Sequence, residues 1–235
     1  MDFLCGSLGD MKTLNTTTGK TRRLVLSDID GTLVRGSLVL DHALFLADLG
    51  ITGAGDDALE EMREYGAQWI DDVKNESAIV NLAEAYRRNI VGLTVNDLLV
   101  TPFLNSTFRD SSNFYSTLSH IIKRRRRGSD VWLISGSPDF LVQPFAEHYG
   151  FSGRGTDYHV DANNRFTGEI TGMMGAAAKR AFISTLDVSS YDYVTGYGDT
   201  ASDIPLFQTS HYTVLVNPTK TTSDAVGVVN KVLTN

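Results

Sequence analysis

Two aspartates, Asp28 and Asp30, stand one residue apart after the apolar run Leu24-Val25-Leu26 and are followed by Gly31 and Thr32. An apolar run that ends at a glycine is typical of a buried strand leading into a tight turn. Alternation along a strand sends both carboxylates to the same side, where they repel each other unless a cation neutralises them or one holds a proton. The pattern therefore predicts a carboxylate nucleophile for phosphorus, a proton-transferring neighbour and a magnesium ion. An Asp-rich turn in which the glycine serves only the backbone is the alternative.

A second polar turn follows another apolar run. Residues 131–134 read as a buried strand, and Ser135-Gly136-Ser137-Pro138 come directly after it. The amphipathic run from Phe140 to Tyr149 predicts a helix with Pro138 at its first position. A hydroxyl and backbone N–H groups at a helix N-terminus bind anions, although a serine there also serves as an ordinary N-cap. Beside the aspartate pair, we interpret this turn as a phosphate site.

A lysine and a second acidic pair complete the set of candidate residues. Lys179 lies near the start of a helix expected over 176–186, where its charge opposes the helix dipole, so we expect it to face another charge. A solvated lysine is the usual explanation of such a residue. Asp199 and Asp203 follow the apolar run 193–198 on a turn into a further helix. Three strand ends therefore carry polar side chains, and ligands of open α/β sheets bind at such ends.

The combination is much more specific than any one of its members. It resembles the four-motif pattern of the haloacid dehalogenase superfamily of phosphohydrolases, with DxDGT at Asp28 to Thr32, a serine at Ser135, a lysine at Lys179 and GDxxxD at Gly198 to Asp203. The resemblance runs from about Arg22 to the C-terminus and looks like the phosphoserine-phosphatase-like branch with a helical cap. It implies an α/β fold with a Rossmann-like, three-layer parallel sheet core, which agrees with the alternation of strands and helices.

The resemblance also implies a role for each motif residue. Asp28 is then the nucleophile, and Asp30 is the general acid and base whose backbone carbonyl also reaches the metal. Ser135 and the N–H of Gly136 would hold the phosphoryl oxygens, and Lys179 would neutralise charge. The expected residues are Asp28 and Asp30 for catalysis; Thr32, Ser135, Gly136 and Lys179 for phosphate; and Asp28, Asp30, Asp199 and Asp203, the last in a supporting role, for Mg²⁺.

Composition and length limit the alternatives. The chain has 235 residues, 42% of them hydrophobic, and a formal net charge of −7. The acidic balance argues against general nucleic-acid binding, which needs a basic surface. One cysteine, Cys5, excludes an intramolecular disulfide. With no membrane-length apolar run and no signal-like start, we expect a cytoplasmic enzyme.

The pattern divides the chain into three parts. Residues 1–21 are expected to be a flexible leader, residues 22–38 and 121–235 the catalytic core, and residues 39–120 a helical cap without strands. Tyr212 to Val216 is expected to be the last strand, followed by a closing helix from about Ser223 to Leu233. Lys123 to Arg127 is an unbroken basic run before Gly128, which we interpret as a solvated helix C-terminus rather than an anionic-surface patch.

The substrate is less well defined than the chemistry. Phosphoserine phosphatases have a glutamate soon after the first motif that reads the substrate's amino group, whereas residues 33–46 contain only Asp41. We therefore expect a small phosphomonoester other than phosphoserine, with Arg35 as a substrate contact because it lies three residues beyond Thr32. The leading hypothesis is a magnesium-dependent phosphatase. A phosphotransferase or phosphomutase using the same aspartyl-phosphate, and a silent phospho-ligand-binding module, are the alternatives, and the oligomeric state stays open.

Overall fold

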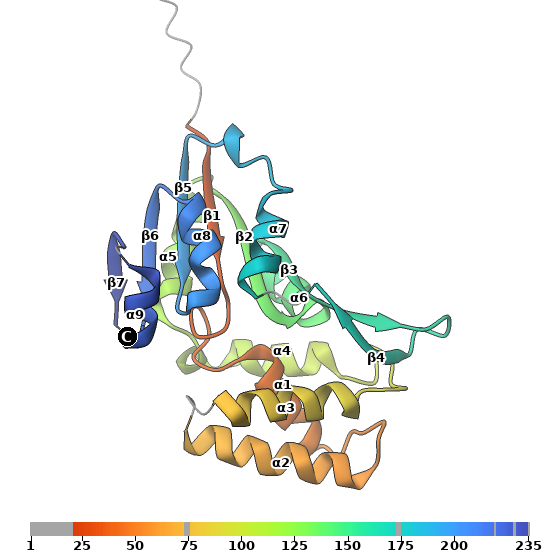
Figure 1. Ribbon diagram of the computed structural model, residues 1–235. Coiled ribbons are helices and arrows are strands. Elements are labelled where there is room, and N and C mark those ends of the chain that lie inside the picture. Colours follow the sequence, from red (N-terminus) through yellow and green to blue (C-terminus); the bar gives the residue numbers. More distant parts are fainter. Residues whose placement is uncertain (1–20, 73–75, 173–174, 219, 228, 235) are drawn as a thin grey trace, which may run out of the picture.

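The protein is built around a seven-stranded sheet with the order β4-β3-β2-β1-β5-β6-β7 (Figure 1). The computed structural model describes residues 21–72, 76–172, 175–218, 220–227 and 229–234, so nearly all of the expected leader, 1–21, lies outside the described residues. Neighbouring strands are parallel except for β3 and β4. The strands are β1 (Arg23–Ser27), β2 (Asp130–Pro138), β3 (Ser152–Val160), β4 (Phe166–Thr171), β5 (Tyr193–Gly198), β6 (Tyr212–Val216) and β7 (Lys231–Leu233).

Helices cover both faces of this sheet and one of its ends. The α-helices are α1 (Leu38–Asp48), α2 (Asp56–Asp71), α3 (Glu76–Asn89), α4 (Val100–Arg109), α5 (Ser116–Arg126), α6 (Asp139–His148), α7 (Ala176–Ile183), α8 (Ile204–Thr209) and α9 (Lys220–Val226). Short 3-10 turns lie at Ser111–Asn113, Val188–Ser190 and Ala201–Asp203. No described helix is long and apolar enough to cross a membrane.

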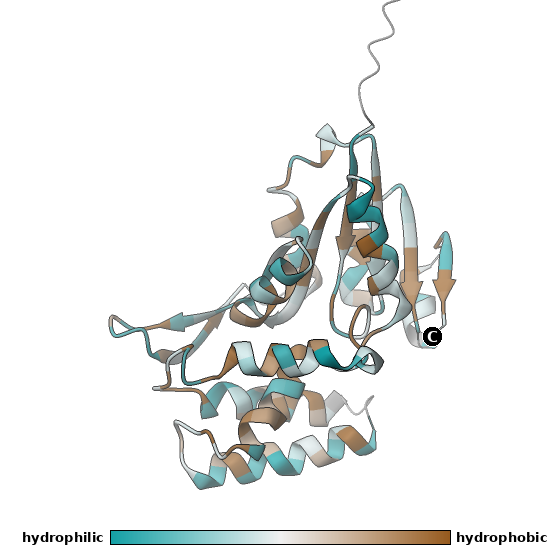
Figure 2. Ribbon diagram, turned by 180° about the vertical axis from the view of Figure 1, so that it is seen from behind, coloured by the Kyte–Doolittle hydropathy of each residue, from teal (hydrophilic) through white to brown (hydrophobic). Residues whose placement is uncertain are grey.

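Alternation along the central strands produces two separate apolar layers. Val25 of β1 belongs to the larger cluster, which includes Ile121 of α5 and Phe145 of α6. Leu24 and Leu26 point to the opposite face, where a smaller cluster contains residues of α7 and α8. The strands are accordingly hydrophobic where helices cover them, as the brown segments in Figure 2 show. The predicted three-layer α/β fold is confirmed.

Four helices, α1 to α4, lie beyond the C-terminal ends of the strands (Figure 1). The described residues of this stretch form helices and no strand. α2 buries one face through Leu59, Met62 and Trp69, in agreement with their helical spacing. The expected cap boundary at residue 120 falls inside α5, whose Leu118 and Ile121 belong to the large apolar cluster that also contains sheet residues.

The C-terminal segment differs from the sequence-based expectation. The expected closing helix is wrong, because α9 ends at Val226 and a further strand, β7, pairs in parallel with β6. Gly227 has a φ of 75°, a left-handed conformation that favours glycine and ends the helix. The Asn217 N–H also donates to the Leu233 carbonyl at 2.7 Å. Local apolar spacing cannot reveal such a strand, since its partner lies elsewhere in the chain.

Candidate active site

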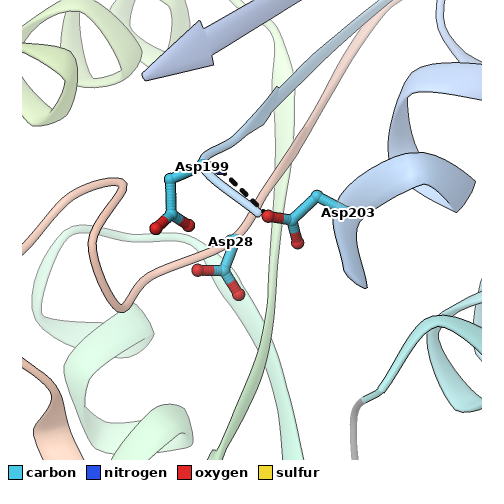
Figure 3. A group of neighbouring side chains, drawn as sticks. All are labelled: Asp28, Asp199 and Asp203. Atoms are coloured by element: carbon cyan, nitrogen blue, oxygen red, sulfur yellow. Dashed lines mark hydrogen bonds between the residues drawn. The ribbon is translucent and has the colours of Figure 1, made fainter. Parts of the chain in front are cut away.

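Three carboxylates meet at the C-terminal ends of β1 and β5 (Figure 3). Asp28 directly follows β1, Asp199 follows β5, and Asp203 ends the short helical turn after it. One oxygen of each lies within 4.8 Å of the others. The Asp28 N–H donates to the Tyr197 carbonyl at 3.1 Å, which extends the β1–β5 ladder and holds the first carboxylate beside the other two. Adjacent parallel strands thus bring together residues about 170 positions apart.

Lys179 is buried between two of these carboxylates. Its Nζ lies 2.7 Å from Asp28 Oδ1 and 2.6 Å from Asp203 Oδ1. Burial by itself would lower the pKa of Lys179, but the charges of Asp28 and Asp203 raise it above its ordinary value, so the ammonium persists. The sequence-based expectation that this lysine faces another charge is confirmed. The reason is its position on α7, whose first turns contact the catalytic end of the sheet.

Some of the carboxylate oxygens in this cluster accept hydrogen bonds, and others do not. Asp203 Oδ2 accepts from the N–H groups of Asp199 and Thr200, both at 3.0 Å, while its Oδ1 binds Lys179. Thr32 Oγ1 donates to Asp199 Oδ1 at 3.1 Å, so this buried threonine positions a carboxylate. Among the described residues, Asp28 Oδ2 and Asp199 Oδ2 accept no side-chain or backbone hydrogen bond.

The acidic cluster fits a divalent cation. Burial, and then the charges of Asp203, Asp199 and Asp30, raise the pKa of Asp28 well above its usual value, against the effect of Lys179. Burial and Asp203 raise the pKa of Asp199 to about 7. The repulsion that raises both values is what a cation would relieve, and Mg²⁺ prefers a few carboxylate oxygens with room for water and phosphate. Asp28 Oδ2 and Asp199 Oδ2 would hold the ion, with Asp203 in support.

Gly31 makes this arrangement possible. Its φ is 73°, and a Cβ at this position would collide with the carboxylate of Asp199. A side chain here would both strain the turn and displace an oxygen that faces the proposed metal. The glycine after the aspartate pair therefore serves the site as well as the backbone.

Asp30 faces a different set of partners from Asp28. Its Oδ2 accepts from Ser135 Oγ at 2.7 Å and from Ser137 Oγ at 2.8 Å, and its Oδ1 accepts from the Leu38 N–H at 2.7 Å. Its carboxylate is outside the three-aspartate cluster. The Asp30 side chain therefore faces the serines of β2, apart from the three-aspartate cluster.

Ser137 is a site residue that sequence reasoning missed. β2 continues through Ser135 and Ser137 to Pro138, so alternation places both serine side chains on the same side of the strand. Pro138 is the N-cap of α6 and not its first helical residue, which corrects that expectation. Reading the strand two residues further would have found the second hydroxyl. Gly136 lies between the serines and is exposed, with open space beside its Cα.

Arg35 lies at a cavity next to the catalytic turn. Its guanidinium carbon is 4.6 Å from the centre of the Tyr115 ring, a cation–π geometry. The cavity, of about 300 Å³, is also lined by Leu38, Asp41 and residues of α4 and the following turn. Burial and the charge of Asp30 raise the pKa of Asp41 to about 7. Arg35 therefore borders a cavity between the loop after the catalytic turn, α1 and α4.

A family model for haloacid dehalogenase-like hydrolases matches residues 25–208. The match covers most of the chain, and the chain belongs to this family. No curated protein sequence matches it.

Solved structures define the fold more closely. A protein of unknown function from Bordetella pertussis Tohama I is similar with a TM-score of 0.69 and 22% identity, over 91% of this chain and 98% of that one. A phosphoserine phosphatase in apo form aligns with a TM-score of 0.59 and 14% identity, over 90% and 93% of the two chains. A substrate-bound phosphoserine phosphatase gives 0.57 and 16%, over 92% and 94%. The fold is thus phosphoserine-phosphatase-like.

Proposed function

We propose that the protein is a magnesium-dependent phosphatase that hydrolyses a small phosphomonoester through an aspartyl-phosphate on Asp28. The observation that carries the proposal is the placement of Asp28 between the Lys179 ammonium and two further carboxylates at the C-terminal edge of the sheet. Family membership supports the same reaction class. A bound Mg²⁺ would stabilise negative charge on the phosphoryl group and allow it to approach the carboxylates.

In this reaction each residue of the site has a separate role. A carboxylate oxygen of Asp28 forms a bond to phosphorus while the bond to the leaving oxygen breaks, and the protonated carboxyl of Asp30 supplies that oxygen with a proton. Asp30 next takes a proton from water, which attacks phosphorus and releases phosphate and free Asp28. Leu38 N–H and the two serine hydroxyls orient Asp30 for both steps. Lys179 offsets charge on Asp28 throughout.

The substrate proposal rests on the cavity beside Arg35. A lid over a strand-end site both excludes water and reads the non-reacting part of the substrate. Arg35 is exposed there, and its guanidinium suits an anionic or hydroxyl-rich group. The solved relatives with this fold include phosphoserine phosphatases, but this chain lacks a glutamate between residues 33 and 46 to pair with an ammonium. We propose a small phosphomonoester other than phosphoserine.

Hydrolysis of an aryl phosphate tests the proposal directly. Activity should require Mg²⁺, be abolished by excess EDTA and return when Mg²⁺ is added back. Full activity in EDTA would contradict the metal-dependent mechanism. Product analysis with added acceptor alcohols separates hydrolysis from phosphotransfer, because a phosphotransferase would form phosphorylated acceptor in preference to inorganic phosphate.

A further inference from the structure

A second cavity lies on the face of the sheet that α5 covers, along β1, β5, β6 and β7. Its volume is about 450 Å³, within the range of small-molecule sites. Four lining residues are the first residues of their strands, namely Arg23 of β1, Tyr193 of β5, Tyr212 of β6 and Lys231 of β7. The C-terminal half of α5 forms the facing wall. We call this cavity the basic groove.

The basic groove is strongly cationic although the protein as a whole is acidic. Its lining contains three arginines, two lysines and a histidine, and no carboxylate among the described residues: Arg23, His120, Lys123, Arg124, Arg127 and Lys231. None of these six takes part in an ion pair within the described part of the chain. Uncompensated like charges in a concave surface raise the local positive potential.

The basic run on α5 is divided by its helical spacing. Lys123, Arg124 and Arg127 line the groove, as positions i, i+1 and i+4 of one helix face do. Arg125 instead donates to the Gly150 carbonyl at 2.8 Å, and neither it nor Arg126 lines the groove. The run does end a helix, as expected from the sequence. Three of its five residues nevertheless line a cavity.

Polar and aromatic groups complete the lining. Arg124 Nε donates to the Tyr197 hydroxyl at 3.0 Å, which fixes the guanidinium against the sheet. Partial burial, and then the charges of Lys231, Lys123 and Arg124, lower the pKa of His120. This direction is the effect expected from cations gathered without an anion. The groove thus has preformed walls, and its cations have no anionic partner among the described residues.

We propose that the basic groove binds a small ligand with two or more phosphate groups. Five permanently charged cations on two facing walls suit a compact polyanion better than a single carboxylate, because one monovalent group would leave most of them unpaired. The volume of the groove suits a metabolite-sized molecule. Free pyrophosphate, tripolyphosphate and a nucleoside triphosphate share this chemistry, and Tyr193, Tyr197 and Tyr212 also line the groove.

Calorimetric titration with each of these three probes, in EDTA, tests the proposal. The variant K123Q/R127Q removes two charges from the groove and leaves the Arg124–Tyr197 hydrogen bond in place. The matched control R125Q/R126Q removes two charges from the same helix outside the groove. We expect the first to weaken tripolyphosphate binding by about tenfold or more and the second to change it less than about twofold.

Three outcomes would overturn the proposal: no heat of binding at millimolar probe, equal losses in the two variants, or tighter binding of a single-stranded oligonucleotide than of any small probe. A nucleoside triphosphate that binds more tightly than tripolyphosphate would support a nucleotide ligand, and equal affinities would support recognition of the phosphate chain alone.

An NMR titration of His120 gives an independent readout. Its pKa should rise when tripolyphosphate is bound, because His120 lines the groove, and an unchanged pKa would contradict binding there.

Discussion

Lys179 and Asp28 make the central contact of the site, at a depth where charge is rarely left unpaired. The side chains are only 2% and 8% exposed, and Asp203, the second partner of the lysine, is fully buried. Removing one charge from this buried cluster is strongly destabilising, because the remaining charges are left uncompensated. The same contact therefore serves both stability and reactivity, and its two contributions can be separated by substitution.

The first prediction concerns the two motif aspartates. Asp28→Asn should abolish turnover, because an amide is not a usable nucleophile and weakens the metal site. Asp30→Asn should instead slow turnover by about 10²–10⁴-fold through loss of proton transfer. Rapid-quench trapping with a labelled phosphomonoester measures both effects. Label recovered on any residue other than Asp28 would contradict the assignment.

The second prediction concerns the buried lysine. Lys179→Met should lower the free energy of unfolding by about 3–5 kcal/mol, since it leaves buried carboxylates without their cation. Arg180→Met is the matched control, because Arg180 is exposed on the same helix and its partner is Gln208. Urea unfolding in EDTA should show a change of less than about 0.5 kcal/mol for the control. Equal changes in the two variants would show that the charge pairing is unimportant for stability.

At the scale of elements, a buried histidine joins three segments of the cap. His42 of α1 lies 2.9 Å from the Tyr86 hydroxyl of α3 and 2.7 Å from the Leu98 carbonyl. Because a carbonyl only accepts, Nε2 carries the hydrogen and Nδ1 accepts from the tyrosine. Burial lowers the pKa of His42 to about 4. The neutral ring is therefore part of the folded cap.

Because the pKa of His42 is lowered, we expect the stability of the fold to decrease in acid. In the unfolded chain this histidine takes up a proton below its ordinary pKa of 6.5, whereas in the folded protein it does so only below about pH 4. The free energy of unfolding therefore falls as the pH falls from 6.5 to about 4. Between pH 7 and 5 the loss from this residue is about 2 kcal/mol. Urea unfolding of the wild type and His42→Gln should show a flatter pH profile in the variant. An NMR titration giving His42 a pKa near 6.5 in the folded wild type would contradict the prediction.

At the scale of the whole molecule, the sheet carries two polar regions of opposite charge. The carboxylates follow the C-terminal ends of β1 and β5, whereas the basic groove lies between α5 and the face formed by β1, β5, β6 and β7. Apolar clusters pack on both faces of the sheet. The cap helices lie over the catalytic end alone (Figure 1).

A substrate panel tests how the cap and the core share recognition. We expect kcat/KM for phosphoserine to be below that for the best sugar phosphate, glycerol phosphate or nucleoside monophosphate. Arg35→Gln should lower kcat/KM for the best anionic substrate by about tenfold and change aryl phosphate hydrolysis much less, because the aryl ester offers nothing to a second anion site. Phosphoserine leading the panel by tenfold would show that the missing glutamate is a poor guide to specificity.

Much of this organisation is determined locally along the chain. The apolar run before Asp28 forms a strand because its side chains can be buried on both faces, and the residues after it must then lie at a sheet edge. The same reasoning placed Asp199 correctly after a strand, whereas Ser135 lies inside β2, which continues to Pro138. Family motifs added roles that spacing alone could not.

Tertiary structure decided what depends on partners far along the chain. The Asp30 side chain binds serines of β2 more than 100 residues away, and Gly31 lies close beside the Asp199 carboxylate. Lys179 is buried because α7 places it between Asp28 and Asp203, and part of the basic run on α5 lines a groove because four strands lie opposite it. β7 forms through pairing with β6. Sequence periodicity records which face of an element is apolar, whereas the identity of the neighbour on that face comes from the packing of the whole chain.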